Sequence, residues 1–154
     1  MTDVGLQRVV DRADITDLLA LWARAIDFPD WDTLRDHVFA EDVTWEWMAS
    51  DGMGSLGDQT HGRADTVAWF ARAIQPETRI RHVLTNHAYR IEGETAHTTS
   101  YMQLVDSANL SCAASGLVIA EHVRTDAGWR IKHLRVEEQI PQGSIDQIAK
   151  TTAG

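Results

Sequence analysis

The chain has 154 residues, of which 44% are hydrophobic and 24% charged, and its formal net charge is −9. This length suits one domain, expected over residues 1–154, that buries its own core. The acidic balance argues against nucleic acid and anionic membranes as partners. Cys112 is the only cysteine, which excludes an internal disulfide framework. Because the sequence shows no signal peptide and no apolar run of ~20 residues, we expect a cytoplasmic protein.

The first half of the chain has the apolar periodicity of helices. A first helix is predicted over Asp14–Asp27, because apolar residues recur there at helical spacing behind a good N-cap. Pro29 ends this helix. The elements expected next are a short helix around Leu34, a strand over Val43–Met48, a glycine-rich loop over Asp51–Gly62 and a third helix over Arg63–Ile74.

The second half alternates between apolar and polar residues, which indicates an antiparallel meander. The tail 142–154 is either disordered or folded across a neighbouring surface, and the pattern leaves both open. Helices followed by a long sheet predict an α+β fold, in which a curved antiparallel or mixed sheet wraps three N-terminal helices like a cone around a central pocket. The expected strands are Arg79–Ile91, Thr95–Asp106, Leu110–Thr125 and Trp129–Ile140.

Two residues stand out as candidates for chemistry. Asp27 closes the first helix, where a carboxylate opposes the helix dipole and therefore calls for another explanation. His82 shares a strand face with Ile80 and Leu84, so it faces apolar surroundings. A solvent-facing carboxylate and a satisfied core histidine are the plainer alternatives. If the two meet, the carboxylate orients the imidazole and leaves Nε2 free to take a proton, which suits elimination, isomerisation or cyclisation.

Other kinds of site find little support. No two histidines have the H-x-x-x-H spacing of a zinc site, and one cysteine adds nothing to it. Nucleotide-binding loops and a serine-nucleophile elbow are also missing from the sequence. We therefore expect neither a metal nor a cofactor.

The order and spacing of several short segments resemble the SnoaL-like branch of the nuclear transport factor two superfamily. That branch includes polyketide cyclases, scytalone dehydratase, ketosteroid isomerase, bile-acid dehydratases and the lindane dehydrochlorinase. The resemblance covers about Val10 to Ile140. Its marks are Ala13–Leu19, Ala25–Asp27, Asp30–Leu34, Phe39–Val43, Gly62, Arg81–Asn86, Gly93–Ala96 and Val123–Ile131.

The resemblance implies a catalytic dyad. In the dehydratase and dehydrochlorinase members an Asp at the end of the first helix pairs with a His on the first long strand, and Asp27 and His82 match these positions. Trp45 matches an aromatic residue of the dehydrochlorinase pocket. Trp22 and Leu134 stand where that enzyme has cationic residues, so the resemblance does not favour dehalogenation.

The expected ligand is a small apolar molecule with a cyclic or aromatic skeleton. The strand that carries Cys112, Ala114, Gly116, Val118 and Ala120 is lined with small residues, which favours a roomy, dry cavity. The residues expected to shape the pocket are Trp22, Trp45, Met102 and Leu134, with Tyr101 as a candidate proton donor to an oxygen.

Our leading hypothesis is a cofactor-independent lyase or isomerase, with dehydration the favoured reaction. The alternative is a non-catalytic binding or accessory domain of the same fold. The resemblance also implies a homodimer or homotrimer formed through the outer face of the sheet, which would cover Leu117, Ile119 and Val123.

Overall fold

The computed structural model describes residues 3–75 and 79–146. These residues form three α-helices, one π-helical turn and six strands. In chain order they are α1 (Asp3–Asp27), α2 (Trp31–Thr33), the π-helical turn η1 (Leu34–Val38), β1 (Phe39–Ser50), β2 (Ser55–His61), α3 (Arg63–Ala73), β3 (Ile80–Glu92), β4 (Thr95–Asp106), β5 (Ser111–Thr125) and β6 (Gly128–Gln139).

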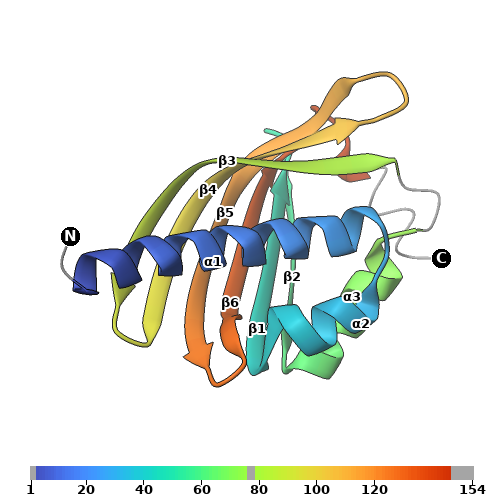
Figure 1. The fold of residues 1–154 in the computed structure, drawn as a ribbon. Coiled ribbons are helices and arrows are strands. Elements are labelled where there is room, and N and C mark those ends of the chain that lie inside the picture. The colour runs from blue at the N-terminus through green and yellow to red at the C-terminus, as the bar shows by residue number, and fades with distance from the viewer. Residues whose placement is uncertain (1–2, 76–78, 147–154) are drawn as a thin grey trace.

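The six strands make one curved mixed sheet in the order β2-β1-β6-β5-β4-β3. Neighbouring strands are antiparallel except β1 and β6, which run parallel. Helix α1 lies across one face of this sheet, and α2 and α3 lie beside its β1–β2 end (Figure 1). The predicted α+β architecture, a curved sheet wrapped on three helices, is confirmed.

The core fills the space between α1 and the concave face of the sheet. Along α1 the apolar residues predicted to share one face are buried, and Ile15, Leu19 and Trp22 are almost inaccessible to solvent. They belong to one cluster with Val118 and Leu134 of the sheet. None of the described helices is long and apolar enough to cross a bilayer.

The start of the first helix differs from the prediction. Helix α1 begins at Asp3, so Asp14 lies within the helix and does not cap it. The large apolar residues before Asp14, which are Leu6, Val9 and Val10, are exposed, so this part of the helix has no buried apolar face of the kind that predicted the rest.

The glycine-rich segment is also different from the prediction, because most of it is an edge strand. Ser55–His61 pairs with β1 over its whole length, and the connecting loop is confined to 51–54. An edge strand needs backbone pairing on one side only, which polar residues and glycines supply without apolar side chains. Most of the tail, 147–154, lies outside the described residues, but the Ile145 amide donates to the buried Asp51 carboxylate at 3.1 Å.

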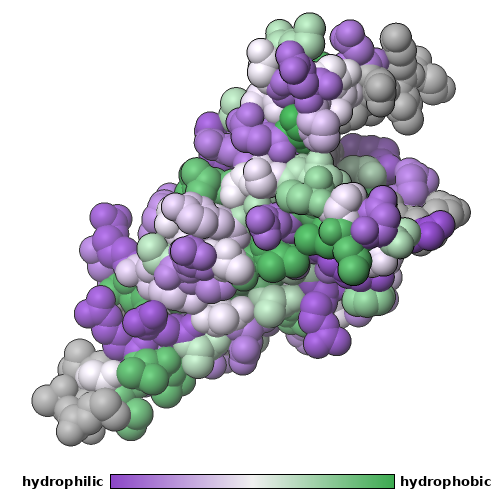
Figure 2. Space-filling model, turned by 90° about the horizontal axis from the view of Figure 1, so that it is seen from above, coloured by the Kyte–Doolittle hydropathy of each residue, from purple (hydrophilic) through white to green (hydrophobic). Residues whose placement is uncertain are grey.

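The outer face of the sheet carries exposed apolar side chains. Tyr101 is 57% exposed, and Leu117, its cross-strand partner, is 36% exposed. Seen from above, the surface of the whole molecule mixes hydrophobic and hydrophilic residues (Figure 2). Assembly through the outer sheet face stays a prediction.

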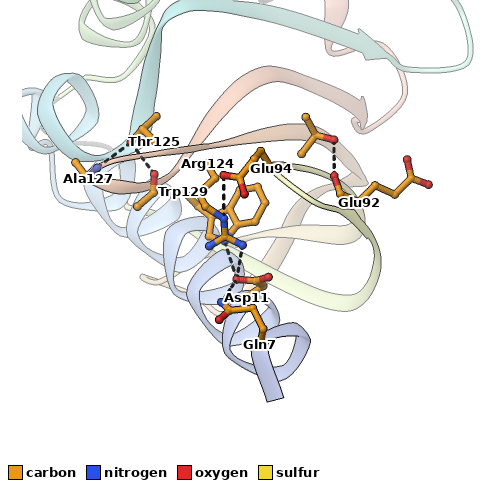
Figure 3. Close-up of polar contacts among 10 residues, drawn as sticks. Gln7, Asp11, Glu92, Glu94, Arg124, Thr125, Ala127 and Trp129 are labelled. Atoms are coloured by element: carbon orange, nitrogen blue, oxygen red, sulfur yellow. Dashed lines mark hydrogen bonds and ion pairs between the residues drawn. The ribbon is translucent and has the colours of Figure 1, made fainter. Parts of the chain in front are cut away.

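A buried carboxylate near the start of α1 ties this helix to the sheet (Figure 3). Asp11, 4% exposed, accepts hydrogen bonds from Arg124 of β5 at 2.7 Å and from Gln7 at 3.0 Å. The Arg124 guanidinium also stacks on the Trp129 ring and pairs with Glu94. Burial raises the pKa of Asp11, but the hydrogen bonds from Arg124 and Gln7 outweigh it and hold the pKa below the ordinary value of 3.8.

We expect Asp11→Asn to lower the free energy of unfolding by about 1–3 kcal/mol at pH 7, because Arg124 then loses its buried charged partner and keeps only the exposed Glu94. A depressed carboxyl pKa stabilises the fold above the ordinary value and loses this effect as pH falls through the folded-state pKa. The difference between wild type and variant should therefore shrink in acid. Urea unfolding at several pH values measures it, with Asp17→Asn, an exposed aspartate of α1, as the control. A difference that does not change with pH would contradict this account.

Candidate active site

The end of α1 is fastened to the start of β3 by one carboxylate. Asp27 Oδ1 lies 2.7 Å from His82 Nδ1, and both carboxylate oxygens accept from the His82 backbone N–H at 3.1 Å. The Arg81 guanidinium donates to the Asp27 carbonyl oxygen at 3.3 Å, which satisfies one group at the helix end. These donors offset the unfavourable placement of a carboxylate at a helix C-terminus.

The pairing determines what the His82 ring can do. The side chains of His82 and Asp27 are only 11% and 7% exposed. With Asp27 on Nδ1, the ring carries its proton there, and Nε2 keeps a lone pair. Nothing in the described part of the chain hydrogen-bonds Nε2. The edge of Trp22 packs against the ring, with centroids 5.7 Å apart.

His82 and Asp27 lie in the wall of a cavity of about 790 Å³. The cavity lies between the C-terminal half of α1, the helix α3 and the concave sheet face. Aromatic residues form one side of the cavity. The ring centroid of Trp45 lies 4.8 Å from that of Phe70 and 5.0 Å from that of Trp69. The other apolar lining residues are Trp22, Ile26, Trp47, Leu56, Ala73, Ile74, Ile80, Met102, Leu104 and Val136.

The structure brings most of the predicted site residues together. Trp22, Trp45 and Met102 line the cavity with Asp27 and His82.

Two predicted lining residues lie elsewhere. Tyr101 is on the outer sheet face, because alternation along β4 turns Met102 toward the cavity and Tyr101 away from it. Leu134 faces inward but is fully buried in the core and does not line the cavity.

The sequence reasoning missed one acidic group of the cavity. Glu138, near the end of β6, lines the same cavity as His82. Its position could have been found from alternation, since Leu134, Val136 and Glu138 share one strand face. A carboxylate on an otherwise apolar face was the signal.

The surroundings of Glu138 favour its neutral form. Burial raises the pKa of the Glu138 carboxyl above its ordinary value of 4.5, and a hydrogen bond from Trp47 and the charge of His82 offset this only in part. The remaining polar residues in the lining are Asp58, Arg72 and Gln75, and Asp58 accepts from Trp69 Nε1 at 2.6 Å. Among the described residues, no group of three histidine, cysteine or acidic side chains could hold a metal ion.

Comparison with known families identifies the domain. Residues 7–135 match the model of the SnoaL-like domain, so the chain belongs to that family. No curated protein matches the chain.

Solved structures share the fold. A candidate aromatic ring hydroxylase of Novosphingobium aromaticivorans is 27% identical, with a TM-score of 0.67 over 86% of this chain and 92% of the other. A candidate dehydratase of the NTF2-like family from Streptomyces avermitilis is 17% identical, with a TM-score of 0.66 over 84% and 96%. The hexachlorocyclohexane dehydrochlorinase of Novosphingobium barchaimii is 17% identical, with a TM-score of 0.67 over 87% and 90%.

We expect Asp27→Ala to destabilise the fold by about 1–3 kcal/mol, because it leaves two buried donors of His82 unpaired. Asp27→Asn keeps one acceptor oxygen and should lose less. Urea unfolding measures both variants against Asp14→Ala, which removes an exposed carboxylate from the same helix. Equal stability of Asp27→Ala and wild type would show that the bond does not hold α1 on β3.

Proposed function

We propose that this SnoaL-like domain is a cofactor-independent lyase or isomerase, in which His82 removes a carbon-bound proton from a small apolar cyclic substrate. The observation that carries the proposal is the Asp27–His82 hydrogen bond in the wall of a large apolar cavity. Dehydration is the reaction we favour, and a double-bond shift is the second choice.

Each residue of the pair has a distinct role. Asp27 holds the proton on Nδ1, so that Nε2 is the basic atom on the ring. When Nε2 takes a proton from carbon, the ring becomes an imidazolium, and the adjacent carboxylate stabilises this charge. Asp27 is therefore a positioning residue, because its contact is with His82.

The chemistry needs a carbon acid, such as the carbon next to a carbonyl group. Removal of its proton by His82 leaves an enolate. In a dehydration the enolate re-forms the carbonyl, a C=C bond forms, and the C–O bond at the neighbouring carbon breaks. The departing oxygen takes a proton from an acidic group in the cavity and leaves as water. In an isomerisation the imidazolium returns the proton to another carbon instead.

The cavity supports a substrate with a ring skeleton. A volume of about 790 Å³ falls within the range of small-molecule sites. Trp47 and Trp69 are only partly buried and line the cavity, and aromatic or alicyclic rings pack well on such side chains.

Two of the three compared proteins support elimination as the reaction class. One is a dehydrochlorinase and another a candidate dehydratase, and both names describe loss of a small group with formation of a double bond. This chain has Trp22 and Leu134 where the resemblance would call for cations to bind a halide, so water suits it better than chloride as the group lost.

A cavity at His82 is also an argument against the alternative of a purely accessory domain. A pair that served only to join α1 to β3 would need no lined space of this size beside it. Activity measurements decide between the two.

The proposal predicts proton exchange at carbon. Cyclic ketones and β-hydroxy ketones of one to three rings are incubated with the protein in D₂O, and mass spectrometry detects gain of deuterium or loss of water. His82→Gln should lower the rate at least ~100-fold, since it removes the base but keeps a polar side chain of similar length. Asp27→Asn should also lower it.

The control is His37→Gln, which replaces an exposed histidine outside the cavity and should keep the wild-type rate. Full activity of His82→Gln would contradict the proposal. Compounds that bind, as measured by quenching of tryptophan fluorescence, but never exchange or lose water would favour the non-catalytic alternative.

A further inference from the structure

Glu138 is placed to meet the same ligand as His82 from another side of the cavity. His82 is on β3 and Glu138 on β6, with β4 and β5 between them. Three interstrand spacings separate the two backbones, about 14 Å along the sheet. Both side chains line the one cavity. A ring-sized molecule therefore fits between the two groups.

The position of Glu138 in β6 directs its side chain toward the concave face of the sheet. Its neighbour Glu137 lies on the outer face and pairs with Arg135 at 2.7 Å, so alternation along β6 directs Glu138 to the concave side. Gly116 is its partner on β5, and a Cβ there would lie 1.8 Å from the Glu137 carbonyl oxygen. The close approach of the two strands at this level therefore requires a glycine.

The carboxyl of Glu138 has one donor partner and no cation bonded to it among the described residues. Trp47 of β1 supplies the donor. The other charged or titratable groups that line the cavity are Asp27 and His82 near one wall, Asp58 of β2 and Arg72 of α3. Arg72 forms no ion pair in the described residues, and Asp58 is bonded to Trp69. This setting favours the protonated form of a carboxyl group over the charged form.

We propose that Glu138 is the general acid of the reaction and protonates the departing hydroxyl oxygen while His82 takes the proton from carbon. The inference rests on the proposed function. The acid assignment extends the proposed function by naming the substrate class, which is a cyclic β-hydroxy carbonyl compound whose hydroxyl group needs acid assistance to leave.

The step balances in protons and electrons. The C–H electron pair becomes the new C=C bond, and the C–O electron pair leaves with the oxygen. The Glu138 O–H supplies the proton that converts this oxygen to water. His82 ends as an imidazolium and Glu138 as a carboxylate. Transfer of one proton from His82 to Glu138 through solvent restores both groups.

Varying the leaving group separates the acid from the base. Two cyclic ketones are compared, one with hydroxyl and one with p-nitrophenoxide at the β-carbon. The phenoxide is stable as an anion and needs no proton to leave. Glu138→Gln should lower kcat for the hydroxy ketone ~100-fold or more and leave the phenoxide substrate within a few-fold of wild type. Glu137→Gln, one residue away on the outer face, is the matched control and should change neither rate.

The same pair of substrates distinguishes the two proposals. Loss of both reactions in His82→Gln, with no effect of Glu138→Gln on either, would overturn the acid assignment and keep the base. Equal loss of both reactions in Glu138→Gln would also overturn it, because it would show a role other than assistance to the leaving group. Full activity of His82→Gln on both compounds would overturn the proposed function itself.

A second measurement needs no substrate. Carbon-13 labelled glutamate gives each carboxyl an NMR signal, and the signal absent in Glu138→Gln belongs to Glu138. It should titrate above the ordinary value of 4.5. Activity on the hydroxy ketone should then fall as pH rises through this pKa, because the acid form is lost. A Glu138 signal that titrates in the ordinary range would overturn the inference, whatever compounds the protein converts.

Discussion

The bond between Asp27 and His82 is the constraint on which both the fold and the site depend. It joins the last residue of α1 to the start of β3, the outermost strand at one edge of the sheet. Asp11 joins the other half of the same helix to β5 through Arg124. The two carboxylates lie sixteen residues apart, about 24 Å along a helix. Helix α1 is therefore held to the sheet at two separate places.

The cavity lies beside the second of these attachments, at the C-terminal end of α1. Apolar residues of α1 between the two carboxylates pack tightly against the sheet, and Ile15 and Leu19 are completely buried. Beyond Trp22 the helix is held both by burial of Ala23, Ala25 and Ile26 and by the hydrogen bonds of Asp27 to His82 of β3. The walls there are completed by α3 and by the aromatic residues of β1, and a space of about 790 Å³ is left between them.

Asp27 therefore contributes both to the stability of the fold and to the proposed chemistry. Asp27 satisfies buried donors of β3, which is a contribution to stability, and it orients the ring of His82, which is a contribution to the proposed chemistry. The apolar lining strengthens both effects, since a hydrogen bond is electrostatically stronger away from water. Burial against the same lining raises the pKa of Glu138 above its ordinary value. One apolar cavity can therefore hold a base and an acid together.

Much of this arrangement was readable from local pattern. The apolar stripe of α1, the four long strands of the meander and the inward face of His82 follow from residue periodicity, which depends on neighbours within a few positions. The family resemblance paired Asp27 with His82, and the structure places them in contact. Alternation along β6 also pointed Glu138 inward, but a lone acidic residue on an apolar face has no meaning until its surroundings are known.

The sequence by itself determined the period at which residues alternate between the two faces of each element, because helix and strand periods are local properties of the chain, but it did not place Tyr101 on the outer face. Only the tertiary structure decided which inward residues share a space. Tyr101 and Met102 are adjacent in sequence, yet one lies on the outer surface and the other lines the cavity. Ser55–His61 forms a strand because β1 offers it a free edge, which no composition reveals. Glu138 meets the site of His82 because the sheet curves, and curvature is a property of all its strands together.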